Sequence, residues 1–174
     1  MVIWITGISA SGKSTLGKYF FKKFKKKYPN TIFFDGDEFR RIFHDDIKYT
    51  LKDRDINAIR LTSLVKYVSQ QQTNIVVSAN ITSLRFRKWC RKNVKNYFEI
   101  FIDTPMEVLK KRDYKKLYRR AFQKKIKDVV GVDIKFIKPK NPDLIINNSF
   151  TKKKLFSNYN LIIRLIRKKK ITIY

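Results

Sequence analysis

The chain has 174 residues, and its 41 Lys and Arg against 14 Asp and Glu give a formal net charge of +27. The length suits one domain, and a hydrophobic share of 43% excludes wholesale disorder despite that charge. A single cysteine, Cys90, excludes an intramolecular disulfide, no apolar run is long enough to span a membrane, and the first residues do not resemble a signal peptide, so we expect a cytoplasmic protein.

Short apolar runs alternate with amphipathic segments along the chain. In chain order the pattern predicts a strand at 2–6, a helix at 13–27, a strand at 31–34, a helix at 53–72, a strand at 74–79, a helix at 84–93, a strand at 97–102, helices at 105–111 and 117–127, a strand at 143–146 and a helix at 151–170. This alternation predicts an α/β fold, with a parallel sheet of about five strands and helices on both faces. We expect residues 1–174 to form one domain, and residues 171–174 stay unassigned.

The basic residues fall in clusters along the whole chain, from Lys22-Lys23 near the start to Arg167–Lys170 near the end. Such a surplus attracts polyanions, so nucleic acids and small nucleotides are both candidate partners. No RNA- or DNA-binding signature accompanies the clusters, and solvated helix faces explain them as well. We therefore expect neither a nucleic-acid partner nor a membrane partner.

The segment Gly7-Ile8-Ser9-Ala10-Ser11-Gly12-Lys13-Ser14 matches the phosphate-binding loop G-x-x-x-x-G-K-[ST] and lies between the first strand and the first helix. Its glycines let backbone N–H groups turn toward phosphate oxygens, and the helix N-terminus adds a positive dipole end. The residues expected to bind the phosphates of ATP are Gly7, Ser9, Ala10, Ser11, Gly12, Lys13, Ser14 and Thr15. Lys13 would act in catalysis on the β- and γ-phosphates, and Ser14 would hold Mg²⁺. The motif predicts a P-loop NTPase-type fold and, without a guanine-binding signature, a kinase.

A second polar group closes the second predicted strand. Asp35-Gly36-Asp37 stands at the carboxyl end of that strand, where neighbouring parallel strands border one crevice. A carboxylate there can orient Mg²⁺ or accept the proton of an attacking hydroxyl group. The alternative role for the same residues is a helix N-cap in a turn. Asp37 is therefore a candidate catalytic residue and a candidate metal ligand.

Taken in order, these motifs resemble the adenylylsulfate (APS) kinase family over most of the chain. Beyond the phosphate loop, the matching segments are Asp35–Arg40, Asp53–Arg60, Ser78–Arg85, Phe98–Pro105, Arg112-Asp113, Leu117-Tyr118, Gly131–Asp133 and Asn141–Leu144. The resemblance implies transfer of the γ-phosphoryl group of ATP to the 3′-hydroxyl of a 5′-activated nucleotide, with Mg²⁺ as cofactor and a homodimer as the assembly. It also implies that residues 112–140, called the lid segment below, form a basic lid over the nucleotides.

The resemblance implies roles for individual residues. Asp37 would lie near the 3′-hydroxyl beside Asp35, while Arg40, Arg54 and Asn57 would hold the 5′ group, for which the paired donors of arginine are suited. The remaining implied positions are Tyr49, Ile81, Ser83, Lys127 and Val129 at the acceptor and Arg112 over the ATP.

The expected acceptor pocket departs from the family pattern. The family holds the acceptor adenine between two aromatic rings, of which Tyr49 keeps one, whereas Val129 stands where the other is usual. Stacking of a base on an aromatic ring contributes roughly 1–3 kcal/mol. Two acceptors are therefore open: APS, which gives PAPS, and cytidine diphosphoramidate, the acceptor of similar enzymes in bacterial capsule biosynthesis, whose smaller base needs less aromatic cover.

Two functions without catalysis compete with the kinase. One is a basic nucleic-acid-binding protein with an inactive phosphate loop, and the other is a scaffold that acts through its basic helices. The intact Lys13, Ser14 and Asp37 argue against the first, and no motif supports the second.

Overall fold

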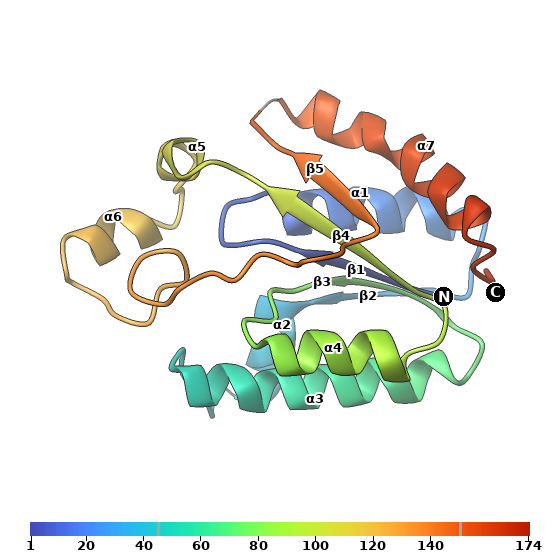
Figure 1. Cartoon of the computed structure of the whole chain (residues 1–174), viewed down its shortest axis with the longest axis horizontal. Coiled ribbons are helices and arrows are strands. Elements are labelled where there is room, and N and C mark those ends of the chain that lie inside the picture. Colours follow the sequence, from blue (N-terminus) through green and yellow to red (C-terminus); the bar gives the residue numbers. More distant parts are fainter. Residues whose placement is uncertain (45, 150) are drawn as a thin grey trace.

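Parallel strands form the centre of the molecule in the computed structural model, which describes residues 1–44, 46–149 and 151–174 (Figure 1). The five strands are β1 (Val2–Thr6), β2 (Thr31–Asp35), β3 (Asn74–Ser78), β4 (Tyr97–Asp103) and β5 (Leu144–Asn147). They lie in the order β2-β3-β1-β4-β5, and every neighbouring pair is parallel. The predicted α/β fold is confirmed, and each strand begins and ends within one residue of its predicted position.

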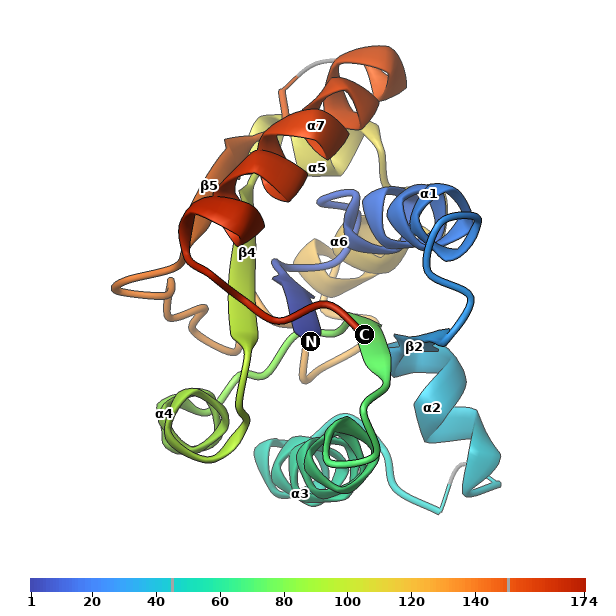
Figure 2. The same cartoon turned by 90° about the vertical axis from the view of Figure 1, so that its right-hand side faces the viewer.

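Helices cover both faces of this sheet. They are α1 (Lys13–Lys25), α2 (Gly36–Ile42), α3 (Leu51–Ser69), α4 (Leu84–Asn93), α5 (Met106–Lys111), α6 (Leu117–Phe122) and α7 (Lys152–Lys168). Figure 2 shows α1 and α7 on one face and α3 and α4 on the other. Alternation along β1 explains the arrangement, because Ile3 and Ile5 pack toward α1 and α7 while Val2 and Trp4 pack toward α3 and α4.

One helix was not predicted from the sequence. α2 follows β2 directly because the side chain of Asp35 accepts the backbone N–H groups of Asp37 and Glu38 and so caps the helix. α3 begins two residues earlier than predicted, since Thr50 and Asp53 form a capping box at its N-terminus.

The lid segment contains less helix than predicted. α6 ends at Phe122 and not at residue 127, because Lys124 has a φ of 55°, in the left-handed region that ends helices. Beyond α6 the segment packs on an apolar cluster that includes Leu109, Tyr118 and Val130. Figure 1 places α5 and α6 past the carboxyl ends of the strands, so the segment borders the loops that follow those strands.

The C-terminal residues 171–174 are placed by the structure at the opposite end of the sheet. Ile171 and Ile173 pack against the cluster formed with α1 and α7, and the backbone N–H of Tyr174 donates to Oδ1 of Asn74 at 3.1 Å. Across the residues that the structure describes, no helix combines the length and hydropathy needed to cross a membrane.

Candidate active site

The phosphate loop joins β1 to α1 at the carboxyl end of the sheet. Gly7 has a φ of 151° and Gly12 a φ of 100°, and both lie very close to other parts of the chain. A Cβ atom on Gly7 would lie 2.8 Å from the carbonyl oxygen of Ile102, and one on Gly12 would lie 2.6 Å from Nδ2 of Asn148. Both positions therefore need glycine, and the loop keeps the tight turn that phosphate binding requires.

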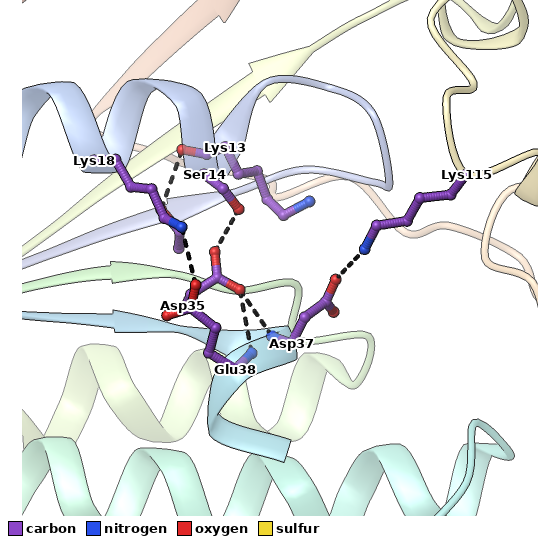
Figure 3. Close-up of polar contacts among 8 residues, drawn as sticks. Lys13, Ser14, Lys18, Asp35, Asp37, Glu38 and Lys115 are labelled. Atoms are coloured by element: carbon purple, nitrogen blue, oxygen red, sulfur yellow. Dashed lines mark hydrogen bonds and ion pairs between the residues drawn. The ribbon is translucent and has the colours of Figure 1, made fainter. Parts of the chain in front are cut away.

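Lys13 begins α1 and folds back over this loop (Figure 3). Its Nζ donates to the carbonyl oxygen of Ile8 at 2.9 Å. Burial lowers the pKa of Lys13 to about 8, although the negative charges of Asp37 and Asp35 oppose this shift. An ammonium group held this way is poised for an anion, because a phosphate beside it would stabilise its charged form.

Ser14 and Asp35 connect the loop to the end of β2. The hydroxyl of Ser14 donates to Oδ2 of Asp35 at 2.5 Å, while Oδ1 of Asp35 accepts the backbone N–H of Asp37 at 3.0 Å. The family resemblance implies that Asp35 lies at the acceptor; in the structure its carboxylate contacts the phosphate loop. The N-cap role weighed for the Asp-Gly-Asp segment is confirmed at Asp35, whose second oxygen contacts Ser14 of the phosphate loop.

The oxygen atoms of this pair fit a magnesium ion. Among the described residues no group of three or more His, Cys, Asp or Glu could hold a metal. Mg²⁺ in kinases keeps several waters and phosphate oxygens and takes only one or two protein ligands, so no such group is required. Ser14 and Asp35 offer hard oxygen donors at the right place. Asp37, which the sequence made a candidate metal ligand, forms an ion pair with Lys115.

Asp37 projects from the first turn of α2 toward the lid segment. Its Oδ2 lies 3.0 Å from Nζ of Lys115, across 78 positions of sequence (Figure 3). Partial burial alone would raise the pKa of the Asp37 carboxyl, but Lys115, together with Lys13 and Arg40, outweighs it and holds that pKa below its usual value. Asp37 is therefore an ionised hydrogen-bond acceptor at neutral pH. Lys115 was missed in the sequence, where it stands among several neighbouring lysines.

Lys13, Ser14, Asp37 and Lys115 line one cavity of about 460 Å³ between the phosphate loop and the lid segment. Its lining residues are Ser9, Ala10, Gly12, Lys13, Ser14, Thr15, Asp37, Arg112, Tyr114, Lys115, Asn148, Lys152 and Leu155. The volume is in the range of small-molecule sites. Most of the residues expected to bind ATP lie on its wall. Gly7 and Ser11 do not, because they support the loop from behind; the carbonyl oxygen of Ser11, for example, accepts Nδ2 of Asn148 at 2.7 Å.

Three of the residues expected at the acceptor lie together beside this cavity. The guanidinium of Arg40 lies 4.7 Å from the ring centroid of Tyr49, and that of Arg54 lies 5.7 Å from it. Arg54 also donates to the carbonyl oxygens of Tyr49 at 2.8 Å and of Asp128, in the lid segment, at 2.7 Å. Two cations thus lie within 6 Å of the ring of Tyr49, whose residue is 53% exposed.

The other expected acceptor residues differ in exposure. Oδ1 of Asn57 is buried with no hydrogen-bond partner among the described residues, Ile81 is buried and Ser83 occupies the N-cap position of α4. Lys127 is exposed. Val129 is only 4% exposed and belongs to the apolar cluster under the lid segment, so in this arrangement it offers almost no surface to a base.

Comparisons with known proteins find relatives along most of the chain. Residues 1–147 match the family model described as adenylylsulphate kinase. A cytidine diphosphoramidate kinase of Campylobacter jejuni is 40% identical over 148 residues, which are 85% of this chain and 86% of that protein. An adenylyl-sulfate kinase of Buchnera aphidicola is 34% identical over 171 residues, which are 93% of this chain and 83% of that protein.

The likeness extends to a solved structure with both nucleotides bound. It is the structure of the APS kinase CysC of Mycobacterium tuberculosis in complex with AMPPNP and APS, which matches with a TM-score of 0.83 and 28% identity. The match covers 95% of this chain and 96% of that chain, so it includes the sheet and nearly all that surrounds it.

Proposed function

The chain belongs to the adenylylsulfate kinase family of ATP-dependent phosphotransferases, and from that premise we propose that it transfers the γ-phosphoryl group of ATP to the 3′-hydroxyl group of APS, giving PAPS. The observation that carries the proposal is the single cavity in which Lys13, Ser14 and Asp37 face Arg112 and Lys115. A triphosphate on the loop would bring its γ-phosphate between the cations of both walls, next to the carboxylate that receives the acceptor.

On the donor side, the backbone N–H groups of the loop and the N-terminus of α1 would bind the phosphates of ATP. Lys13 would reach the β- and γ-phosphates, and their charge would raise its pKa again. Ser14 and Asp35 would hold Mg²⁺, which supplies charge neutralisation on the phosphate oxygens when it is bound. Arg112, which donates to the carbonyl oxygen of Asn148 at 2.9 Å, would cover the nucleotide from the lid segment.

On the acceptor side, Asp37 would accept a hydrogen bond from the 3′-hydroxyl and hold its oxygen in line with the γ-phosphate. Positioning is the main demand, because phosphoryl transfer depends on it more than on proton removal. The side chains of Asp37 and Lys115 are 65% and 52% exposed, so their ion pair contributes at most about 1 kcal/mol. An arriving substrate can therefore separate them, and Lys115 can then meet phosphate oxygens.

The 5′ group of the acceptor would bind to the cations around Tyr49. The guanidinium groups of Arg40 and Arg54 lie over the ring of Tyr49. Their paired N–H donors suit a phosphosulfate or a similar anion. The side-chain carbonyl oxygen of Asn57, which has no partner in the described part of the chain, would accept a hydrogen bond from the acceptor nucleotide. Ile81, Ser83 and the lid residue Lys127 would complete the pocket.

Cytidine diphosphoramidate is the second candidate acceptor. The cytidine diphosphoramidate kinase of Campylobacter jejuni is more similar in sequence to this chain than the Buchnera enzyme is, at 40% against 34% identity. Val129 supplies no aromatic surface, and a pyrimidine needs less than a purine does. With this acceptor the enzyme would act in capsule biosynthesis, whereas APS would place it in sulfate assimilation.

We also propose that residues 1–174 act as one domain, in the cytoplasm, and as a homodimer. Cytoplasmic ATP is the co-substrate that the phosphate loop needs. Ile42, Leu51 and Ile59, which lie on α2 and α3 and are 50–65% exposed, offer apolar surface for a subunit contact. Light scattering of the purified protein tests the dimer, and a monomer at assay concentration would contradict it.

The function is tested by supplying purified protein, Mg²⁺ and ATP with each acceptor separately. Release of ADP and the mass of the nucleotide product are followed. A product heavier by one phosphoryl group from APS supports the first candidate, and such a product from the cytidine compound alone supports the second. If neither acceptor gains a phosphoryl group, the proposed function is wrong.

A further inference from the structure

A buried arginine outside the catalytic cavity connects two segments that flank the acceptor region. Arg87, on α4, is 7% exposed. Its Nε donates to the carbonyl oxygen of Ile81 at 2.6 Å, and its Nη1 donates to the carbonyl oxygen of Ile137. Its Nη2 is buried and has no hydrogen-bond partner in the described part of the chain. No carboxylate of that part lies within ion-pair distance of it.

A charge in this position is costly to the fold. Burial lowers the pKa of Arg87, and an apolar side chain of similar size could fill the space without desolvating a cation. The guanidinium adds a planar fork, which holds two carbonyl groups at a fixed separation. Ile81 belongs to residues 79–83, the segment after β3 that is expected to line the acceptor pocket. Ile137 belongs to residues 134–140, the part of the lid segment that returns to β5 and is called the return part below.

The return part is also fastened to β4. The ring of Phe136 lies 5.8 Å from that of Phe101 and 5.6 Å from the guanidinium carbon of Arg87. Lys138 pairs with Asp103, at the end of β4, at 2.7 Å. None of these groups lines the catalytic cavity, so bound nucleotides would leave their contacts in place.

The forward part of the lid segment, residues 112–133, is held differently. Lys115 pairs with Asp37, and Arg54 donates to the carbonyl oxygen of Asp128. Asp37 and Arg54 are residues that the acceptor is expected to contact, so substrate and lid compete for them. The forward contacts therefore use groups that a bound acceptor would claim, whereas the contacts of Arg87 use none of them.

From this difference we propose that Arg87 is a positioning residue for the phosphoryl transfer. Its fork fixes residues 79–83 to the return part, so that the acceptor pocket keeps its shape while the forward contacts open and close. The proposal rests on the proposed function, because residues 79–83 matter to turnover only if the acceptor binds against them.

The test uses steady-state kinetics on the full chain with whichever acceptor is turned over. The variants are Arg87→Met, which removes the charge, and Arg87→Lys, which keeps the charge but not the fork. Lys88→Met is the control, since Lys88 is an exposed lysine on the same helix. We expect both Arg87 variants to raise the KM for the acceptor about tenfold, with the KM for ATP within about twofold of the wild-type value. The control should leave both constants unchanged.

Hydrogen exchange keeps the proposal testable where Arg87→Met does not fold. In Arg87→Lys, amides in residues 79–83 and 134–140 should exchange faster together, while those of the phosphate loop stay protected. A folded Arg87→Lys variant with the wild-type acceptor KM, or faster exchange in only one of the two segments, would overturn the proposal. If the wild-type protein turns over neither acceptor, the proposed function fails, and the exchange experiment still decides whether Arg87 couples the two segments.

Discussion

The donor half and the acceptor half of the proposed active site are built in different ways. The donor half consists of one continuous loop, whose glycines, Lys13 and Ser14 are fixed by local backbone geometry. The proposed acceptor half would be assembled from α2, α3, the segment after β3 and the lid segment. Its charged side chains contact other segments of the chain, since Asp37 pairs with Lys115 and Arg54 donates to the backbone carbonyl oxygen of Asp128.

This difference separates what is fixed in the enzyme from what can change. A preformed loop commits the protein to a nucleoside triphosphate, whatever the acceptor is. The acceptor half depends on contacts between distant segments, and a change in one segment alters the pocket without touching the chemistry. We therefore expect substitutions in the donor half to abolish turnover and those in the acceptor half to shift substrate preference, stability or positioning.

The largest effect is expected from Lys13→Ala. It removes the cation that faces the γ-phosphate, and we expect kcat to fall about 10³-fold with either acceptor. Lys18→Ala is the matched control, since Lys18 lies on the same helix but pairs with Glu38 at the surface. Initial rates of ADP release by the two variants and the wild-type protein measure this effect. Turnover that survives Lys13→Ala at the wild-type rate would contradict the role of Lys13 at the γ-phosphate.

Asp37→Asn should have the next largest effect. It keeps the shape of the side chain but loses the charge that accepts the hydroxyl, so we expect kcat to fall about 10²-fold while ATP affinity stays within about twofold. Asp35→Asn provides the contrast, because it should weaken binding of ATP with Mg²⁺ and loosen the cap of α2. Identical kinetic profiles for the two variants would contradict the division between the halves.

Val129→Phe tests whether residue 129 lines the acceptor pocket or belongs to the apolar cluster under the lid segment. Because Val129 is buried in the apolar cluster under the lid segment, the larger ring should lower the free energy of unfolding by about 1–3 kcal/mol. Lys127→Phe, at an exposed neighbouring position, should change stability little. Denaturant unfolding measures both. An unchanged stability with a lower KM for APS would show instead that residue 129 faces the acceptor base.

The smallest effect concerns pH. Lys13 has a pKa lowered to about 8 in the free protein, and bound phosphate raises it, so ATP binding takes up a proton when the pH exceeds that value. Between pH 7.5 and 8.5 the charged fraction of Lys13 falls about threefold, and the affinity for ATP should fall by the same factor. Calorimetry in buffers of different ionisation enthalpy should show uptake of about half a proton at pH 8. The uptake should vanish in Lys13→Ala, and equal uptake there would assign the titration to another group.

The donor half and the sheet could be predicted from sequence because their signals are local. Each strand is a short apolar run, and the phosphate loop lies within eight residues. The acceptor half could not be predicted as well, because its contacts join distant positions. Nothing near Lys115 distinguishes it from the neighbouring lysines, and only the fold brings it to Asp37. Likewise, Asp35 faces Ser14 because β2 and β1 end at the same edge of the sheet, with β3 between them. A motif does not reveal this order of the strands.

The most direct test of the account concerns the position that receives the phosphoryl group. Purified enzyme would be given ATP with Mg²⁺ and the 2′-deoxy or the 3′-deoxy form of the acceptor that it turns over, and product masses would be compared. We expect the 2′-deoxy acceptor to gain one phosphoryl group and the 3′-deoxy acceptor to gain none. Phosphorylation of the 3′-deoxy acceptor would contradict the claim that Asp37 presents the 3′-hydroxyl to the γ-phosphate of ATP.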